Sequence, residues 1–338
     1  MPKLESIGRS RPAALEAKIE ILRELAARPG RWVSGADLAA RLSLSRTAVS
    51  NHVRALRRLG YSIESASARG HRLTSIPDTI HPVELWREMG RTGFPAEIHF
   101  FERTDSTSTQ AAKMAEAGAP HGTLVLAERQ DAGRGRLGRG WSSPAGSGLY
   151  FSLLLRPELP PHQAPQLTLL AAVAVARAVE EIAGVAPEIK WPNDLLLGGK
   201  KFCGILTEMA GGVDRVRWVI LGIGINVTTQ EFPGELQPLA TSLALGLGRP
   251  PPRRAPLLAA VLAQLEGLLG QYASKGFPLI GLEWERYAKI GGRSVRVSAP
   301  DGTKLEGIAR GLASDGALLL ERPGGALERI LAGDVGFA

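Results

Sequence analysis

The stretch GRGRLGRGW, at residues 133–141, sets three arginines into a string of glycines and ends on a tryptophan. Glycine has no Cβ, so the backbone turns sharply and approaches a ligand closely. Arginine supplies planar, permanently charged donors that fit phosphate and carboxylate oxygens, and an indole offers a flat face to a base or a cation. This combination predicts a loop that closes over a nucleotide-like anion; a solvated basic loop is the plainer alternative.

The same glycines also satisfy the pattern G-x-G-x-x-G, with Gly133, Gly135 and Gly138 in the three places. That pattern indicates a dinucleotide-binding fold only where a strand precedes it and a helix begins on its last glycine. Residues 123–127 have the composition of a strand, but residues 139–146 hold too much glycine and proline to begin a helix. The sequence therefore argues against the dinucleotide fold, and it contains no G-x-x-x-x-G-K-S/T phosphate loop either.

A second motif, KWPND at residues 190–194, places a lysine at the expected end of a strand. The proline restricts the backbone of Trp191 to extended conformations, and this constraint fixes the direction in which Lys190 points. The motif therefore predicts a second fixed positive charge for an anionic ligand.

The composition sets broad limits on the class of protein. The chain has 338 residues, of which 44% are hydrophobic, and no apolar run approaches the length of a membrane span. The single cysteine, Cys203, excludes an intramolecular disulfide and suits a reducing compartment, and the six histidines show no zinc-ligand spacing. With no leader of the secretory form, we expect a cytoplasmic protein of two or three domains without a membrane partner.

The net charge of +8 is unevenly distributed. Residues 1–75 hold 14 Lys and Arg against 6 Asp and Glu, whereas the rest of the chain is balanced. A positive excess confined to one end indicates a polyanionic partner for that end.

The basic end has the pattern of a winged helix-turn-helix. Hydrophobic spacing predicts helices at 15–27, 35–42 and 46–59, and alternation predicts a hairpin at 61–65 and 70–74. The side chains suited to phosphates and base edges are Arg46, Thr47, Ser50, Asn51, Arg54 and, at the tip of the hairpin, Arg69. We expect this end to bind DNA; a small helical interaction domain is the alternative.

The remaining elements indicate a larger α/β region and a β-rich tail. Strands are predicted at 98–102, 123–127, 148–155, 195–197, 202–208 and 218–227, and helices at 109–116, 163–182, 257–271 and 279–286. Four short strands, at 294–297, 304–312, 317–320 and 327–330, follow. They suggest a small barrel of about five strands.

In order and spacing these segments resemble the biotin protein ligases, specifically the bifunctional bacterial type that also represses the biotin operon. The matching pieces are Asp105-Ser106-Thr107, the run from Gln130 to Trp141, the KWPND motif and Gly222-Ile223-Gly224-Ile225-Asn226. The winged helix-turn-helix and the barrel-like tail match as well. The resemblance covers nearly the whole chain from Leu15 onward.

The resemblance implies an α+β architecture of three domains. These are a winged helix-turn-helix at 1–75, a mixed-sheet α/β domain of the biotin/lipoate ligase type at 76–288 and an SH3-like β-barrel at 289–338. It implies that ATP and biotin, with Mg²⁺, give biotinyl-5′-AMP and pyrophosphate, and that biotin then passes to a lysine of a biotin carboxyl carrier protein. Operator DNA and a homodimer promoted by the adenylate are the other implied partners.

The same resemblance implies roles for individual residues. Lys190 and Arg136 are the implied catalytic cations, because fixed positive charge stabilises the negative charge that develops when a carboxylate attacks an α-phosphate. The implied biotin-binding residues are Ser106, Thr107, Ser108, Gln130, Arg134, Gly135, Arg136 and Lys190. The implied nucleotide-binding residues are Arg136, Arg139, Asn226 and Trp141, which would stack on adenine; Asp194 is a candidate for a metal or a hydrogen bond.

Three positions depart from the family pattern. Ser108 replaces the usual asparagine, and Leu137 and Gly140 stand where basic residues often occur. Three other hypotheses stay open at this level: a ligase whose head has no regulatory role, a ligand-sensing transcription factor without catalysis, and a lipoate ligase, which the motifs favour less.

Overall fold

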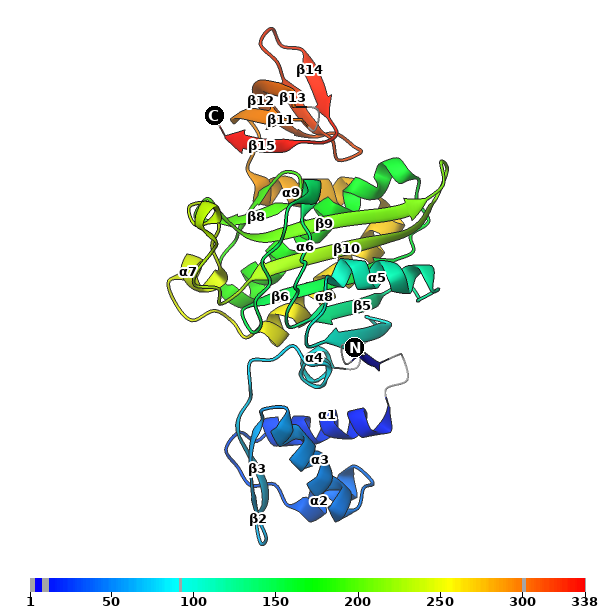
Figure 1. Ribbon diagram of the computed structural model, residues 1–338, viewed down its shortest axis with the longest axis vertical. Helices are drawn as coiled ribbons and strands as arrows, with labels where there is room; N and C mark the ends of the chain where they lie inside the picture. Colours follow the sequence, from blue (N-terminus) through cyan, green and yellow to red (C-terminus); the bar gives the residue numbers. More distant parts are fainter. Residues whose placement is uncertain (1–3, 8–11, 91–92, 300–301, 338) are drawn as a thin grey trace.

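The computed structural model describes residues 4–7, 12–90, 93–299 and 302–337. Three units follow one another along the long axis of the molecule: a small helical head, a central sheet with its helices, and a small β unit (Figure 1). The predicted α+β architecture is confirmed.

The head is a three-helix unit with a β-hairpin. Its elements are α1 (Ala13–Ala26), α2 (Gly35–Arg41), α3 (Arg46–Arg58), β2 (Ser62–Ala66) and β3 (Gly70–Ser75). Ser34 and Ser45 accept hydrogen bonds from backbone N–H groups in the first turns of α2 and α3, so each helix begins where its cap predicts. Val49, Val53 and Leu56 point inward from α3, which leaves its polar face to solvent.

The central sheet is mixed and, in the described part of the chain, has eight strands. Their order is β1 (Leu4–Ile7), β4 (Glu97–Phe101), β5 (Thr123–Ala127), β6 (Gly148–Leu155), β10 (Val216–Asn226), β9 (Lys200–Gly211), β8 (Asp194–Leu197) and β7 (Glu188–Lys190). Only β4 and β5 run parallel; the other neighbours are antiparallel. The strand β1 comes from the end of the chain that was predicted to belong to the head, yet it pairs with β4.

The two faces of this sheet are covered unequally. Alternate residues of a strand face opposite sides, and α6 (Ala164–Ala183) and α8 (Arg254–Lys275) pack on one of them, with α9 (Pro278–Ala288) against α6. On the other side, the short helix α5 (Thr107–Glu116) packs on β5, β6 and β10.

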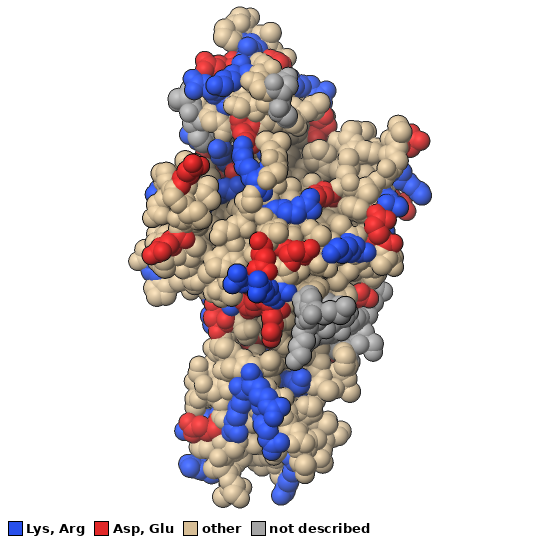
Figure 2. All heavy atoms as spheres, viewed as in Figure 1, with Lys and Arg blue, Asp and Glu red and all other residues tan. Residues whose placement is uncertain are grey.

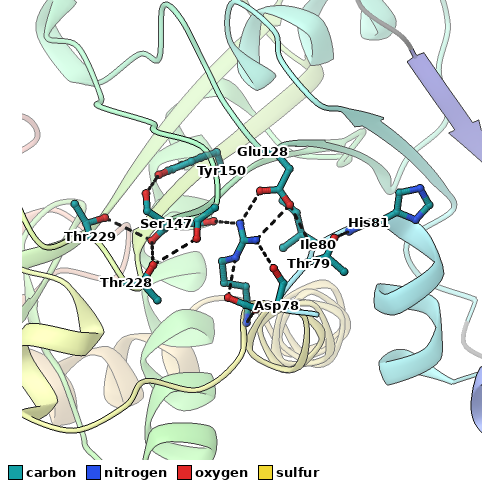
Figure 3. A network of polar contacts seen from close by, with 12 residues as sticks. Asp78, Thr79, Ile80, His81, Glu128, Ser147, Tyr150, Thr228 and Thr229 are labelled. Carbon is teal, nitrogen blue, oxygen red and sulfur yellow. Dashed lines mark hydrogen bonds and ion pairs between the residues drawn. The ribbon is translucent and has the colours of Figure 1, made fainter. Parts of the chain in front are cut away.

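The connection between head and sheet is held by buried charge. It contains α4 (Pro82–Met89), an element the sequence pattern did not predict. Asp78 and Glu128 converge on one guanidinium (Figure 3), which belongs to Arg254 at the beginning of α8 and is 2% exposed. Arg254 also donates to the carbonyl of Gly148, at the beginning of β6. A single buried side chain thus joins the linker to the central sheet.

The C-terminal unit is an antiparallel five-stranded sheet. Its strands are β11 (Ser294–Ser298), β12 (Lys304–Leu312), β13 (Leu318–Glu321), β14 (Leu327–Ile330) and β15 (Asp334–Phe337), in the order β14-β13-β12-β11-β15. Val295, Val297, Leu318, Leu320 and Val335 form its interior. Within the residues described, no helix has the length and apolarity needed to cross a membrane.

Candidate functional site

The arginine-glycine stretch forms a closed loop, which we call the lid loop (residues 133–141). The N–H of Trp141 donates to the carbonyl of Gly133 at 2.8 Å, and the N–H of Gly135 donates to the carbonyl of Arg139 at 2.7 Å. A Cβ on Gly133 would lie 2.3 Å from the carbonyl oxygen of Trp141, so only glycine allows this closure. At the tip, Leu137 has a φ of 56° and is 60% exposed.

The indole of Trp141 rests on a patch of sheet without side chains, which we call the glycine trough (Gly204, Gly222 and Gly224). A Cβ on Gly224 would lie 2.4 Å from Nε1 of Trp141, and one on Gly204 would lie 3.0 Å from its Cζ3. Nε1 is buried and has no hydrogen-bond partner among the described residues. The glycines of β9 and β10 therefore give a flat aromatic group direct access to the sheet backbone.

The polar end of the trough is built around the first turn of α5. Oε1 of Gln130 accepts from the backbone N–H of Thr107 at 2.8 Å and from its hydroxyl at 3.1 Å, while Nε2 donates to the hydroxyl of Ser143. Gln130 precedes the lid loop in sequence, and its side chain thus caps the beginning of α5. Ser106, the residue at the N-cap position, makes no side-chain capping hydrogen bond. Ser106, Thr107 and Ser108 are all buried, so the structure brings four predicted biotin-binding residues together here.

A serine that the sequence analysis did not single out lies beneath this turn. The hydroxyl of Ser152, in the middle of β6, is 2.9 Å from that of Thr107 and 3.1 Å from that of Ser108. Ser152 is fully buried. The hydroxyl of Ser108, which replaces the usual asparagine, is therefore engaged with the sheet. A lone serine in an otherwise apolar strand was the available signal.

Asp105 orders the approach to this turn. Burial alone would raise the pKa of its carboxyl, but hydrogen bonds from Gln110, from the N–H of Ser106 and from Thr104 outweigh that effect and lower the pKa. The side chain therefore stays ionised at neutral pH. It restrains the corner between β4 and α5.

Most cations of the site are held by carboxylates. Arg134 pairs with Glu208 at 2.5 Å, and Lys201 pairs with Asp194 at 2.6 Å. Arg136 and Arg139 share a third carboxylate in the C-terminal unit. Lys190, half-buried at the end of β7, has no ion pair or hydrogen bond from its ammonium group to any described residue.

Lys201 and Asn193 are site residues that the sequence analysis missed. The ammonium of Lys201 lies 5.5 Å from the centroid of the Trp141 ring, so a cation faces the indole above the trough. Asn193 accepts from Nη1 of Arg136 at 2.9 Å and donates to the carbonyl of Ile205 at 2.9 Å. Lys201 stands in a Gly-Gly-Lys-Lys turn, which by itself is typical of a solvated hairpin.

Two predicted residues have contacts that differ from a direct ligand role. Asn226 is buried, and its amide donates to the carbonyl of Thr241 at 3.1 Å, which closes the loop after β10. One carboxylate oxygen of Asp194 is engaged by Lys201. Among the described residues no group of three or more His, Cys, Asp or Glu side chains is placed to hold a metal ion.

Five of the six predicted DNA-binding residues share one exposed face of α3. Arg46, Thr47, Ser50, Asn51 and Arg54 are all exposed on α3. Figure 2 shows Lys and Arg side chains gathered over the head. The guanidinium of Arg69, in the wing, lies 4.5 Å from the ring centroid of Trp32.

Comparison with protein families matches each unit separately. The head matches an HTH domain at residues 18–72, and the last unit matches the biotin protein ligase C terminal domain at residues 290–337. The central unit matches the biotin/lipoate A/B protein ligase family at residues 100–226. These matches place the chain in the biotin/lipoate class of protein ligases.

Individual relatives narrow the class. The bifunctional ligase/repressor BirA of Bacillus subtilis is 42% identical over 306 residues, which cover 90% of this chain and 93% of that protein. The Escherichia coli protein of the same name is 30% identical, over 87% of this chain and 90% of its own length. A solved structure of the Aquifex aeolicus biotin protein ligase in complex with biotin and ATP is 32% identical, with a TM-score of 0.61 over 71% of this chain and 98% of that one. The chain belongs to the bifunctional biotin ligase/repressor family.

Proposed function

We propose that this chain joins biotin to ATP and then transfers the biotinyl group to a lysine of a biotin carboxyl carrier protein, a subunit of acetyl-CoA carboxylase. One observation carries the proposal: an aromatic-covered glycine trough lies between the buried hydroxyls of α5 and the cations of the lid loop. An apolar bicyclic ring with a polar ureido group fits the α5 end, and phosphates fit the cationic end. The Aquifex aeolicus relative binds both biotin and ATP.

The proposed chemistry has two steps, and neither needs a covalent enzyme nucleophile. A carboxylate oxygen of biotin attacks the α-phosphorus of ATP, and the bond to pyrophosphate breaks. The amine of the carrier lysine then attacks the acyl carbon, loses a proton, and AMP leaves. Fixed cations stabilise the charge that grows on the phosphate oxygens in the first step.

Each predicted residue takes a place in this scheme. Ser106, Thr107, Ser108 and Gln130 bind the ring system, with Arg134 and Gly135 beside it. Lys190, Lys201 and Arg136 surround the reacting carboxylate and phosphate. Trp141 stacks on adenine, Arg139 lies near the phosphates, and Asn226 shapes the nucleotide end through the loop it closes.

Mg²⁺ would enter with the phosphates of ATP. Mg²⁺ is commonly bound through one or two carboxylates plus substrate phosphates. Asp194 would be the carboxylate that contributes an oxygen. The ion would neutralise phosphate charge when bound.

The first prediction separates the two lysines from ordinary surface charge. Lys190→Ala and Lys201→Ala should each lower biotin-dependent pyrophosphate release by about 10²-fold or more, because each removes a fixed cation at the reacting centre. Lys200→Ala, at the exposed neighbouring position, is the matched control and should leave the rate unchanged. Undiminished turnover in either variant would remove that lysine from the scheme.

We further propose that the head represses biotin genes as part of an adenylate-promoted homodimer in the cytoplasm. One helix-turn-helix buries too little surface for tight site-specific binding, whereas two on half-sites spaced by helical turns supply it. The ligand controls DNA binding if it binds the dimer-competent state better than the monomer. The proposed units remain 1–75, 76–288 and 289–338. The strand β1 belongs to the first unit by sequence but pairs with β4 in the sheet of the second.

A gel shift on a biotin-gene promoter tests the repressor half. We expect a sequence-specific shift that requires biotin and ATP, and its loss in Asn51→Ala without loss of pyrophosphate release. Promoter DNA of scrambled sequence is the control. If no ligand-dependent shift forms while ligation proceeds, the chain is a ligase with a non-regulatory head.

A further inference from the structure

We propose that Asp334, in β15 of the C-terminal unit, is a positioning residue for adenylate formation: its carboxylate holds the two tip arginines of the lid loop over the site. The inference rests on the ligase function proposed above. Through these arginines, the C-terminal unit would contribute indirectly to binding ATP and to retaining the intermediate.

One carboxylate contacts both arginines. Oδ1 of Asp334 is 3.2 Å from Nη1 of Arg136, and Oδ2 is 2.9 Å from Nη2 of Arg139. The arginines flank Leu137 and Gly138, the two residues at the tip of the lid loop with positive φ. The tip is therefore fixed at both sides by a group that lies about two hundred residues further along the chain.

The residue before Asp334 is built to present its backbone to the same arginine. The carbonyl of Gly333 accepts from Nη1 and Nη2 of Arg136, both at 3.4 Å. Gly333 has a φ of 152°, and a Cβ there would lie 2.8 Å from Cγ1 of Val297 and 2.9 Å from the carbonyl oxygen of Ser298. Only glycine fits at this position. Arg136 is therefore held by a backbone carbonyl that requires glycine as well as by the carboxylate of Asp334.

The KWPND motif also contacts the C-terminal unit. Asn193 accepts from Arg136 at 2.9 Å, and the indole N–H of Trp191 donates to the carbonyl of Gly316 at 3.4 Å. Lys190 adjoins Trp191 in the chain. The C-terminal unit thus contacts both cationic motifs, the tip of the lid loop and the end of β7, and restrains their positions relative to each other.

This arrangement supports a role in positioning more than in stability. Arg139 is 67% exposed, and ion pairs at such sites contribute little to folding. Arg136 is only 23% exposed and has acceptors on both sides. Its guanidinium has five donors, so donors remain for a phosphate while the carboxylate and carbonyls keep it in place. A prearranged cation binds ATP without first paying the entropy of ordering its side chain.

The experiment uses the full chain and three substitutions at one position. Asp334→Asn and Asp334→Ala should raise KM for ATP about tenfold, the equivalent of one charge-assisted hydrogen bond, and leave KM for biotin unchanged. They should also increase labelling of bystander lysines, as Arg136→Gly should, because the lid no longer retains the adenylate. Asp334→Glu should restore much of the wild-type behaviour.

Glu328→Gln is the matched control, since Glu328 is a carboxylate of the same unit that pairs with Arg322 and lies in β14, at the opposite end of the strand order from β15. It should leave both KM values and bystander labelling unchanged. In the double variant Arg136→Gly/Asp334→Asn the effects should not add, because Asp334 acts through the arginine.

Several results would overturn the proposal. A similar rise in KM with Glu328→Gln, or a loss of thermal stability with unaltered kinetics, would make Asp334 a purely structural residue. A fall in KM for ATP would show that Asp334 competes with phosphate. If the wild-type chain releases no pyrophosphate with biotin and ATP, the ligase function itself fails, and that outcome is visible before any variant is made.

Discussion

At the scale of single residues, the site depends on absent side chains as much as on present ones. The glycine trough lets an indole touch the backbone of β9 and β10, and Gly222 leaves room for the hydroxyl of Ser108, which a Cβ would approach to 2.5 Å. Gly222 and Gly224 belong to a motif that the sequence analysis quoted, whereas Gly204 was not singled out. Their partner, Trp141, comes from a different part of the chain, and only the fold reveals the contact.

Gly224→Ala should therefore impair nucleotide binding. The added methyl would press on Nε1 and Cε2 of Trp141, which are 2.4 and 2.5 Å from the ideal Cβ position. Overpacking of this kind costs about 1–3 kcal/mol, so we expect KM for ATP to rise about ten- to hundredfold. Steady-state kinetics with ATP and biotin varied separately would measure it.

Gly212→Ala is the control for that substitution, because nothing lies within 4 Å of its ideal Cβ. Both variants should keep the wild-type circular dichroism spectrum. Equal KM values for ATP in the two variants would mean that nucleotide binding does not depend on the contact between Trp141 and the glycine trough.

At the scale of elements, the sequence predicted the long, periodic segments closely and missed several short ones. The pattern predicted α3, α6, β6 and β10 closely, because each has many apolar residues at a clear period. It missed β1, β15 and α4, which span four to eight residues and are defined by pairing partners or buried charge. The helix α5 begins at Thr107, two residues before the predicted start, because Gln130 binds its first N–H group.

Short elements assemble much of the site. The strand β7, expected only as the strand that ends at the KWPND motif, carries Lys190. Of the missed elements, β15 carries Asp334 and α4 connects the head. Motifs identified the chemical groups of the lid loop and of KWPND, but the pairing of each cation with a carboxylate far away in sequence could not be predicted. Such pairs depend on tertiary structure, and one sequence contains no periodic signal for them.

At the scale of the whole molecule, the head is joined to the centre by a second buried charge network. The hydroxyl of Tyr61, in the head, donates to Glu84 of α4 at 2.7 Å. Arg87 and Arg253, which precedes Arg254 at the beginning of α8, pair with the same carboxylate at 2.8 and 3.0 Å. The side chain of Glu84 is fully buried, so the head and two helices of the central unit share one ionised group.

This network predicts a pH dependence of stability. Burial alone would raise the pKa of Glu84, but Arg87, Tyr61 and Arg253 outweigh that effect and lower it. A carboxyl with a lowered folded pKa stabilises the folded state above its unfolded pKa, and that contribution is lost as pH falls through the folded value. Glu84→Gln should therefore cost about 3 kcal/mol at neutral pH, and its deficit relative to wild type should shrink in acid.

Thermal unfolding from neutral to acidic pH would measure this difference. Glu266→Gln, at an exposed position of α8, should follow the wild-type curve at every pH. A deficit of constant size across the range would show that Glu84 acts through packing alone.

The junction between the lid loop and the C-terminal unit also bears on how such proteins evolve. A domain that makes no contact with the functional site of its neighbour can be exchanged between relatives without loss of that site. Here one network of hydrogen bonds and ion pairs crosses the boundary between two domains. It joins Gly333 and Asp334 of the C-terminal domain to Arg136, Arg139 and Asn193 of the central domain. A chimera that carries the C-terminal domain of a relative would keep the fold but could lose the contacts with the lid arginines. We therefore expect the two domains to change together in evolution and to be inherited as one unit.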